Sequence, residues 1–163
     1  MNQKFTTVFR IVLPAILIGE LALVSPVSAG VISNHSGTIC TNYNAKDVTK
    51  IDRYSYGTRS LKTSATTVVC PLTRNTSSSY GAYVYVDIYH ASYATTKCTA
   101  FSYDEDGYLL TSTSAGWTGG GLHEFSLNLT GLGSSSSFSD YSVVCSIPGG
   151  GAGIIQGVDL SEQ

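Results

Sequence analysis

The stretch "YGAYVYVDIYHASY", residues 80–93, decides the fold because its side chains alternate in type with a period of two. Successive side chains of a β-strand point to opposite faces of a sheet, so the two sets belong to two faces. One face is aliphatic and consists of Ala82, Val84, Val86 and Ile88. The other is mostly aromatic and consists of Tyr83, Tyr85, Asp87 and Tyr89. The pattern predicts a central strand whose aliphatic face lies in the core.

Strand-like runs recur along the rest of the chain, separated by turn signals about every ten residues. The clearest of them cover residues 64–72, 95–103, 107–114, 122–129, 140–147 and 152–160. The glycine-rich stretch 116–121, "GWTGGG", and the serine-rich stretch 131–139 are predicted to be loops. No segment after residue 30 has a sustained helical period. We therefore expect an all-β, antiparallel β-sandwich of about eight strands with Greek-key or jelly-roll connections.

The first 29 residues have the pattern of a signal peptide. Lys4 and Arg10 precede a mostly apolar run at 11–24, and Val27-Ser28-Ala29 has the small side chains of a signal peptidase site. We expect cleavage after Ala29, which leaves residues 30–163 as one secreted domain, extracellular or periplasmic, with no further membrane segment. An uncleaved anchor is the alternative.

Four cysteines lie in the predicted mature chain, at Cys40, Cys70, Cys98 and Cys145. An even number of cysteines in an exported protein predicts two disulfides, and four cysteines allow three pairings. We favour Cys40–Cys70 and Cys98–Cys145 because each bridge closes a local part of the chain. The cysteine and histidine spacing fits no zinc motif, and we expect no metal or other cofactor.

Several of these segments together resemble a known group of proteins. The stretches "GTIC", "TTVVCPLTR", "KCTAFSYDEDG", "YSVVCSIPGG" and "GIIQGVDL" look like those of a group of small exported bacterial β-sandwich proteins with four cysteines. The resemblance covers most of the mature chain and implies a bacterial exported β domain. It implies no catalytic residue and no ligand.

Charge limits the classes of partner. Only 12% of the residues are charged, and the formal net charge is −2. Nucleic acids and anionic membranes are bound by clustered lysine and arginine, which this sequence lacks. We therefore expect neither as a partner.

The segment "SYDEDGYLL" raises the question of calcium. Ser102, Asp104 and Asp106 have the alternate spacing of oxygen ligands, and Gly107 stands where an EF-hand loop bends. Thr113, however, occupies the position of the bidentate glutamate, and no helices flank the segment. A hairpin turn built on Asp106-Gly107 is therefore favoured over a weak calcium site.

No catalytic constellation is evident in the sequence. There is no G-x-S-x-G motif, and Asp87 and His90 fall on opposite faces of one strand. His90 and His123 are expected at the rim of the core. The acids near strands, Asp87, Glu124 and Asp140, have no spacing that pairs them and are expected to be solvated. A small secreted hydrolase is the less favoured alternative to a non-enzymatic protein.

The tyrosines provide the best binding hypothesis. A tyrosine ring offers an apolar face and a hydrogen-bonding tip, which suit the C–H face and the hydroxyl rim of a sugar. We expect Tyr83, Tyr85 and Tyr89, together with Trp117, to form a platform for a polysaccharide or another cell-envelope component. Two alternatives stay open. The tyrosines could cover a sheet without binding anything, or the chain could associate with itself as a structural extracellular protein.

Overall fold

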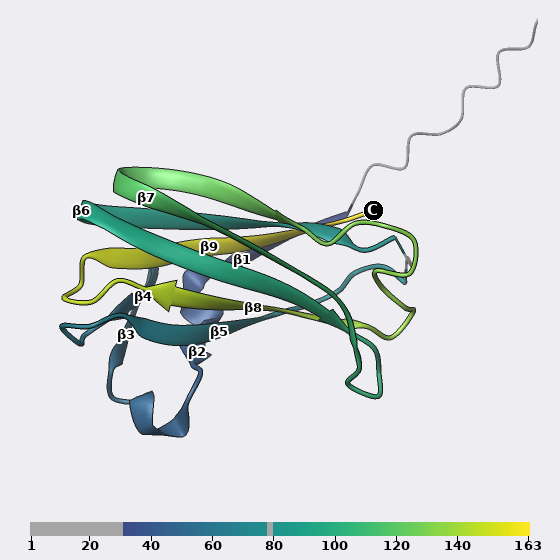
Figure 1. Ribbon diagram of the computed structural model, residues 1–163, viewed down its shortest axis with the longest axis horizontal. Coiled ribbons are helices and arrows are strands. Elements are labelled where there is room, and N and C mark those ends of the chain that lie inside the picture. The colour runs from purple at the N-terminus through teal and green to yellow at the C-terminus, as the bar shows by residue number, and fades with distance from the viewer. Residues whose placement is uncertain (1–30, 78–79) are drawn as a thin grey trace, which may run out of the picture.

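The computed structural model describes residues 31–77 and 80–163, and it confirms an all-β sandwich. The predicted signal peptide, residues 1–29, lies outside the described residues. Within them, no helix is long and apolar enough to cross a bilayer. The strands (Figure 1) are β1 (Val31–Ser36), β2 (Thr41–Asn42), β3 (Ile51–Tyr54), β4 (Gly57–Ser60), β5 (Thr66–Leu72), β6 (Ala82–Tyr103), β7 (Leu109–Asn128), β8 (Asp140–Ile147) and β9 (Gly153–Glu162).

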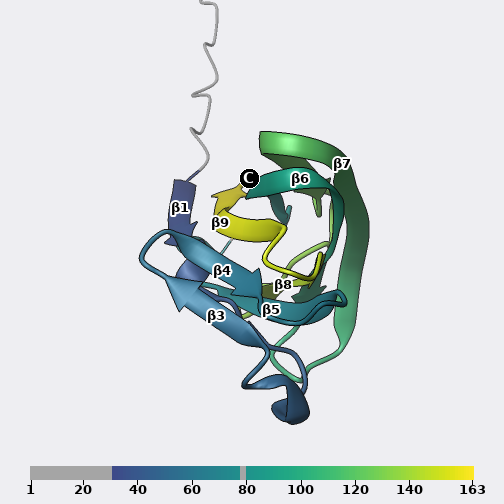
Figure 2. The ribbon, with the colours of Figure 1, turned by 90° about the vertical axis from the view of Figure 1, so that its left-hand side faces the viewer.

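Strand β6 organises the sandwich because it is 22 residues long and has partners on both sides. β7 runs antiparallel along one side of it for almost its whole length. On the other side β9 pairs with residues 82–90 and β8 with residues 97–103, so β8 and β9 lie end to end. The resulting three-stranded ribbon is bent near its middle, and its two halves pack around one core (Figure 2).

The remaining strands widen the two halves into layers. β1 and β4 pair with β9, and β3 pairs with β4; we call this side the β9 layer. β5 pairs with β8, and β2 pairs with β5; we call this side the β8 layer. Because the even-numbered side chains of β6 point inward in both halves, its odd-numbered side chains lie on the outer faces of both layers.

His90 lies inside the bend of β6. Its side chain is 1% exposed, which corrects the prediction that it lies at the rim of the core. Nδ1 is 2.9 Å from the Gly119 carbonyl oxygen of β7, and Nε2 is 2.8 Å from the Thr96 hydroxyl oxygen. A carbonyl oxygen can only accept, so Nδ1 donates to Gly119, and in the neutral imidazole the Thr96 hydroxyl then donates to Nε2. The imidazole thus joins both halves of β6 to the neighbouring strand.

The glycine-rich stretch at 116–121 is not a loop, as the sequence predicted, but the middle of β7. Its glycines let the strand follow the bend. Gly121 has a φ of +91°, which L side chains rarely adopt. A Cβ on Gly119 would lie 2.5 Å from the Trp117 ring, so the absence of a side chain there makes room for the indole.

The core confirms the inward face predicted from residues 80–93. Ala82, Val84, Val86 and Ile88 are fully buried, together with side chains of β5, β8 and β9. Burying such aliphatic side chains contributes about 1.5–3 kcal/mol each for valine and isoleucine.

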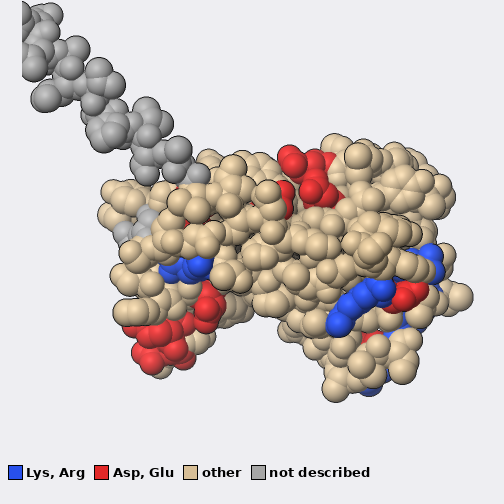
Figure 3. Space-filling model, turned by 180° about the vertical axis from the view of Figure 1, so that it is seen from behind, with Lys and Arg blue, Asp and Glu red and all other residues tan. Residues whose placement is uncertain are grey.

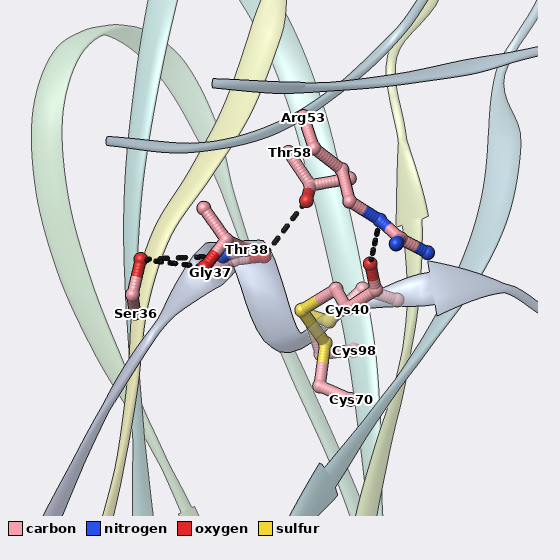
Figure 4. The surroundings of a disulfide bond; sticks show 9 residues. Ser36, Gly37, Thr38, Cys40, Arg53, Thr58, Cys70 and Cys98 are labelled. Atoms are coloured by element: carbon pink, nitrogen blue, oxygen red, sulfur yellow. Dashed lines mark hydrogen bonds between the residues drawn. A yellow bond between two sulfur atoms is a disulfide. The ribbon is translucent and has the colours of Figure 1, made fainter. Parts of the chain in front are cut away.

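Both predicted disulfides are present. Cys98 and Cys145 are directly opposite each other on β6 and β8. Cys40, just before β2, is bonded to Cys70 of β5. Figure 4 shows Cys98 beside the Cys40–Cys70 bridge, so the two bridges lie next to each other in the β8 layer. Disulfides of this kind are typical of proteins that fold in an oxidising compartment.

Hydrogen bonds attach the β3–β4 hairpin to the segment that carries Cys40 (Figure 4). Arg53 Nε donates to the Cys40 carbonyl oxygen at 3.1 Å, and the Thr58 hydroxyl donates to the Gly37 carbonyl oxygen at 2.8 Å. Gly37 begins a short 3₁₀ turn, η1 (Gly37–Ile39), and a Cβ there would lie 2.0 Å from the Ile155 carbonyl oxygen of β9. These contacts fix the hairpin against β9.

A buried ion pair holds the end of the sandwich opposite the bend. Arg74 Nε donates to Glu162 Oε1 at 3.0 Å, and the backbone N–H groups of Asn75 and Thr76 donate to Oε2 at 2.6 and 2.9 Å. The Glu162 side chain is 1% exposed. The carboxylate therefore joins β9 to the chain that follows β5.

We predict that Glu162→Ala lowers the free energy of unfolding by about 3–5 kcal/mol, because it leaves the buried guanidinium without this carboxylate. Urea unfolding measures the change. Asp52→Ala is the matched control, since the half-exposed Arg59–Asp52 pair, at 3.4 Å, should cost under about 1 kcal/mol to break. Equal losses in the two variants would contradict the importance given to Glu162.

Candidate functional site

The outer face of the β9 layer carries the predicted tyrosines. Tyr83, Tyr85, Asp87 and Tyr89 of β6 lie in its centre, and we call this surface the tyrosine face. Each of these four residues lies between one residue of β7 and one residue of β9. Tyr83 lies between Asn128 and Ser161, and Tyr85 lies between Ser126 and Asp159. Hydrogen-bonding side chains thus border the first two rings on both sides.

The first two rings form a pair, and the third stands apart. The Tyr83 and Tyr85 centroids are 6.5 Å apart with an angle of 31° between the ring planes, and both side chains are half-buried. Tyr89 is more exposed and lies between Leu122 and Ile154, which makes its surroundings apolar. No side-chain hydrogen bond joins the three phenol groups to another residue in the described ranges.

Asp87, between Tyr85 and Tyr89, is not the isolated acid that the sequence suggested. The strand register places it opposite Glu124, and a Cβ on Gly157 would lie 2.7 Å from its Oδ2 atom. Burial, followed by the negative charges of Asp159 and Glu124, raises the pKa of Asp87 above its usual value. Three carboxylates therefore gather beside the paired rings.

Trp117 is not brought to the tyrosine face. It projects from the inward side of β7 at the bend, and its ring stacks on His123 with a centroid distance of 4.4 Å and an angle of 15°. The His90 ring lies 5.2 Å from it. The glycine-rich stretch that was predicted to carry Trp117 on a loop is part of a strand, so Trp117 packs against the core instead.

The described residues assemble no triad around a histidine. Both ring nitrogens of His90 have partners, and Asp87 lies on the opposite face of β6, as predicted. Asp140 begins β8 on the other layer, far in register from Asp87 and Glu124.

Asp104 and Asp106 lie in the turn between β6 and β7. Asp104 Oδ1 accepts hydrogen bonds from the backbone N–H groups of Asp106, at 3.1 Å, and Tyr108, at 2.7 Å. Gly107 has a φ of +82°, as a tight hairpin requires. These bonds give Asp104 a structural role in the turn. The described residues contain no group of three His, Cys, Asp or Glu side chains placed to hold a metal ion.

A second surface, which was not among the predicted sites, lies on the outer face of the β8 layer. There the structure has a groove of about 530 Å³, which lies over β5, β8, β6 and β7 and contains Lys97. The signal for it was present, because the alternation that defines residues 80–93 continues to Tyr103. Phe101 and Tyr103 form a stacked pair on the same side of β6, with centroids 5.9 Å apart.

No protein-family model and no curated protein matches the chain. Among solved structures, the CBM36-1 domain of a multidomain xylanase from the hindgut metagenome of Trinervitermes trinervoides is 8% identical. The match covers 82% of this chain and 98% of that chain, with a TM-score of 0.47. The C-terminal CBM6 of LamC, a marine laminarinase from Zobellia galactanivorans, is 13% identical, with 81% and 100% covered and a TM-score of 0.46.

A structure of infectious bursal disease virus, Gx strain, is also similar. It is 9% identical over 81% of this chain and 32% of that chain, with a TM-score of 0.47. At identities of at most 13% and TM-scores of at most 0.47, these likenesses carry no inference about a ligand of this chain.

We predict that Asp87→Asn stabilises the protein at pH 7. A carboxyl group whose pKa is raised by folding contributes its full stability at pH values below its unfolded pKa, 3.8. This contribution is lost as the pH rises through the folded pKa. Urea midpoints should therefore be higher for the variant at pH 7 and equal to wild type near pH 3. Glu124→Gln should give a smaller gain of the same sign. A less stable Asp87→Asn protein at pH 7 would contradict the prediction.

Proposed function

We propose that this protein is a non-enzymatic carbohydrate-binding domain that binds a neutral polysaccharide on the tyrosine face. One observation carries the proposal. The paired rings of Tyr83 and Tyr85 lie on an outer sheet face, and their neighbours on β7 and β9, Asn128, Ser126, Ser161 and Asp159, all carry hydrogen-bonding side chains. The β-sandwich provides a rigid base for both rings, because the alternate residues of β6 are fully buried.

The chemistry of this surface suits a sugar chain. The ring faces provide apolar contact for the C–H groups of a pyranose, and the phenol tips exchange hydrogen bonds with its hydroxyls. Carboxylates accept strong hydrogen bonds from hydroxyl donors, and Asp87, Asp159 and Glu124 are within the same patch. Three negative charges repel uronic acids and sulfated sugars, so the favoured ligand is uncharged.

The location of such a ligand agrees with the exported context that the sequence predicts. A signal peptide over residues 1–29 would deliver the domain outside the cytoplasm, where polysaccharides and envelope components occur. Two disulfides would support it there. The surface in Figure 3 carries few charged side chains, which fits an uncharged partner better than nucleic acid.

We expect wild-type protein to co-sediment with at least one of cellulose, insoluble xylan, curdlan and chitin. Tyr83→Ala and Tyr85→Ala should each weaken this binding about tenfold or more, because each removes a stacking ring. Tyr85→Phe should keep most of the binding, since it retains the ring. Depletion isotherms provide the measurement, and thermal melts confirm folding.

Tyr108→Ala is the matched control because Tyr108 is 70% exposed and lies in the β6–β7 turn, away from the tyrosine face. Trp117→Phe should also leave binding unchanged. The proposal fails if no polysaccharide is bound, or if Tyr83→Ala and Tyr85→Ala bind as well as Tyr108→Ala.

Self-association is a second candidate function, which the long free edge of β7 favours. In the described part of the chain β7 pairs only with β6, which leaves one edge of a 20-residue strand without a partner. Glu124 is its only charged residue, and it contains no proline. Natural edge strands usually carry charges or proline that prevent pairing between molecules, and β7 has little of either.

Sedimentation velocity over a range of concentrations tests this candidate. We predict dimers or larger assemblies of wild-type protein, and a shift to monomers for Ser112→Lys, which places a charge on the free edge. Ser55→Lys, in the exposed turn between β3 and β4, is the control for added charge. A monomer at every concentration excludes self-association through β7.

A further inference from the structure

The groove on the outer face of the β8 layer has the size of a ligand-binding site. Side chains from four adjacent strands line it, and its volume of about 530 Å³ lies within the usual range for ligand sites, about 300–1,000 Å³. Six of the lining residues carry hydroxyl groups: Thr67, Thr95, Thr99, Ser114, Thr118 and Ser146. Val144 provides an apolar contact between the hydroxyls of β6 and β5.

Gly116 lets β7 lie close to β6 at the groove. It lies directly opposite Lys97 on β7, and a Cβ there would lie 2.5 Å from the Thr96 carbonyl oxygen. The register places Thr67, Ser146, Lys97 and Gly116 in one row across the sheet. Without a side chain at its end, this row is open on the β7 side.

Four of the six hydroxyls of the groove are paired by hydrogen bonds. Thr95 pairs with Thr118 at 2.8 Å, and Thr99 pairs with Ser114 at 2.7 Å, each across the β6–β7 ladder. One hydroxyl of each pair donates to the other, so the second keeps its own hydrogen for a ligand. Both oxygens keep a lone pair as well. Each pair thus presents a donor and acceptors to the groove.

Lys97 is the only ionisable residue that lines the groove. Its side chain is exposed and forms no ion pair with any residue in the described ranges. An ammonium group without a counter-charge, among fixed hydroxyls, favours a ligand that is both hydroxylated and anionic. The tyrosine face differs from the groove because it carries three carboxylates and the groove carries an ammonium group.

We propose that this groove binds a saccharide that carries a carboxylate, such as a uronic-acid oligomer, with the carboxylate on Lys97 and the sugar hydroxyls on the Thr99–Ser114 and Thr95–Thr118 pairs. Phe101, the next outward residue of β6 after Thr99, extends the surface with an aromatic ring that stacks on Tyr103. The site lies on the opposite layer from the tyrosine face and does not depend on it.

Titration calorimetry of the whole domain with trigalacturonate and with neutral cellotriose tests the proposal. We expect trigalacturonate to bind and to weaken as salt is raised, because its main charged contact is exposed to solvent. Lys97→Gln should lower its affinity about two- to fivefold, as expected for loss of a solvent-exposed ion pair. Lys46→Gln, an exposed lysine of the 3₁₀ turn η2 (Ala45–Asp47), should leave it unchanged.

Variants of the tyrosine face separate the two proposals. Tyr83→Ala and Tyr85→Ala should not change trigalacturonate binding, and amide chemical shifts should move at Thr99 and Ser114 rather than at Tyr83. Trigalacturonate binding that is undetectable, or that is insensitive to Lys97→Gln, overturns the groove proposal. Neither of these two results bears on the binding of neutral polysaccharide at the tyrosine face. Any cellotriose bound at the tyrosine face should instead be lost in Tyr83→Ala and Tyr85→Ala.

Discussion

The bend in β6, with the His90 imidazole inside it, is the constraint on which the rest of the structure depends. An aliphatic side chain in place of the buried His90 would leave the Gly119 carbonyl and the Thr96 hydroxyl without this hydrogen-bond partner. Because β7, β8 and β9 all follow β6, one bend sets the angle between the two layers. It also determines which outward residues of β6 share a surface, and so it separates the tyrosine face from the groove.

Much of the fold could be predicted from local sequence, because alternation and cysteine number are local signals. The inward set from Ala82 to Ile88 and both disulfide pairings are confirmed. Residues 116–121 were wrongly assigned to a loop because glycine weakens strands, whereas here pairing with β6 holds them extended. The partners of Asp87 depend on the register between distant strands, which no local pattern contains. Trp117 was predicted on a loop because its glycine-rich segment was, whereas it lies on β7 and packs against the core.

The two outer surfaces differ in charge although one strand forms the centre of both. Toward one end of β6 the outward residues lie among Asp87, Glu124 and Asp159, and toward the other they lie around Lys97. Each end also carries a pair of outward aromatic rings two residues apart. A single extended strand thereby forms the centre of two outer surfaces of opposite charge, each beside a pair of aromatic rings.

The position of β9 has a consequence for the timing of folding. β9 follows every other described strand in the sequence, yet it lies between β6 and β1, and its register joins Val31 to Glu162. The layer that contains it cannot close until that late segment is available. Pairings between such distant segments form slowly, because a long loop must first be ordered. The β9 layer is therefore completed only when nearly the whole described chain, from Val31 to Glu162, is free to fold.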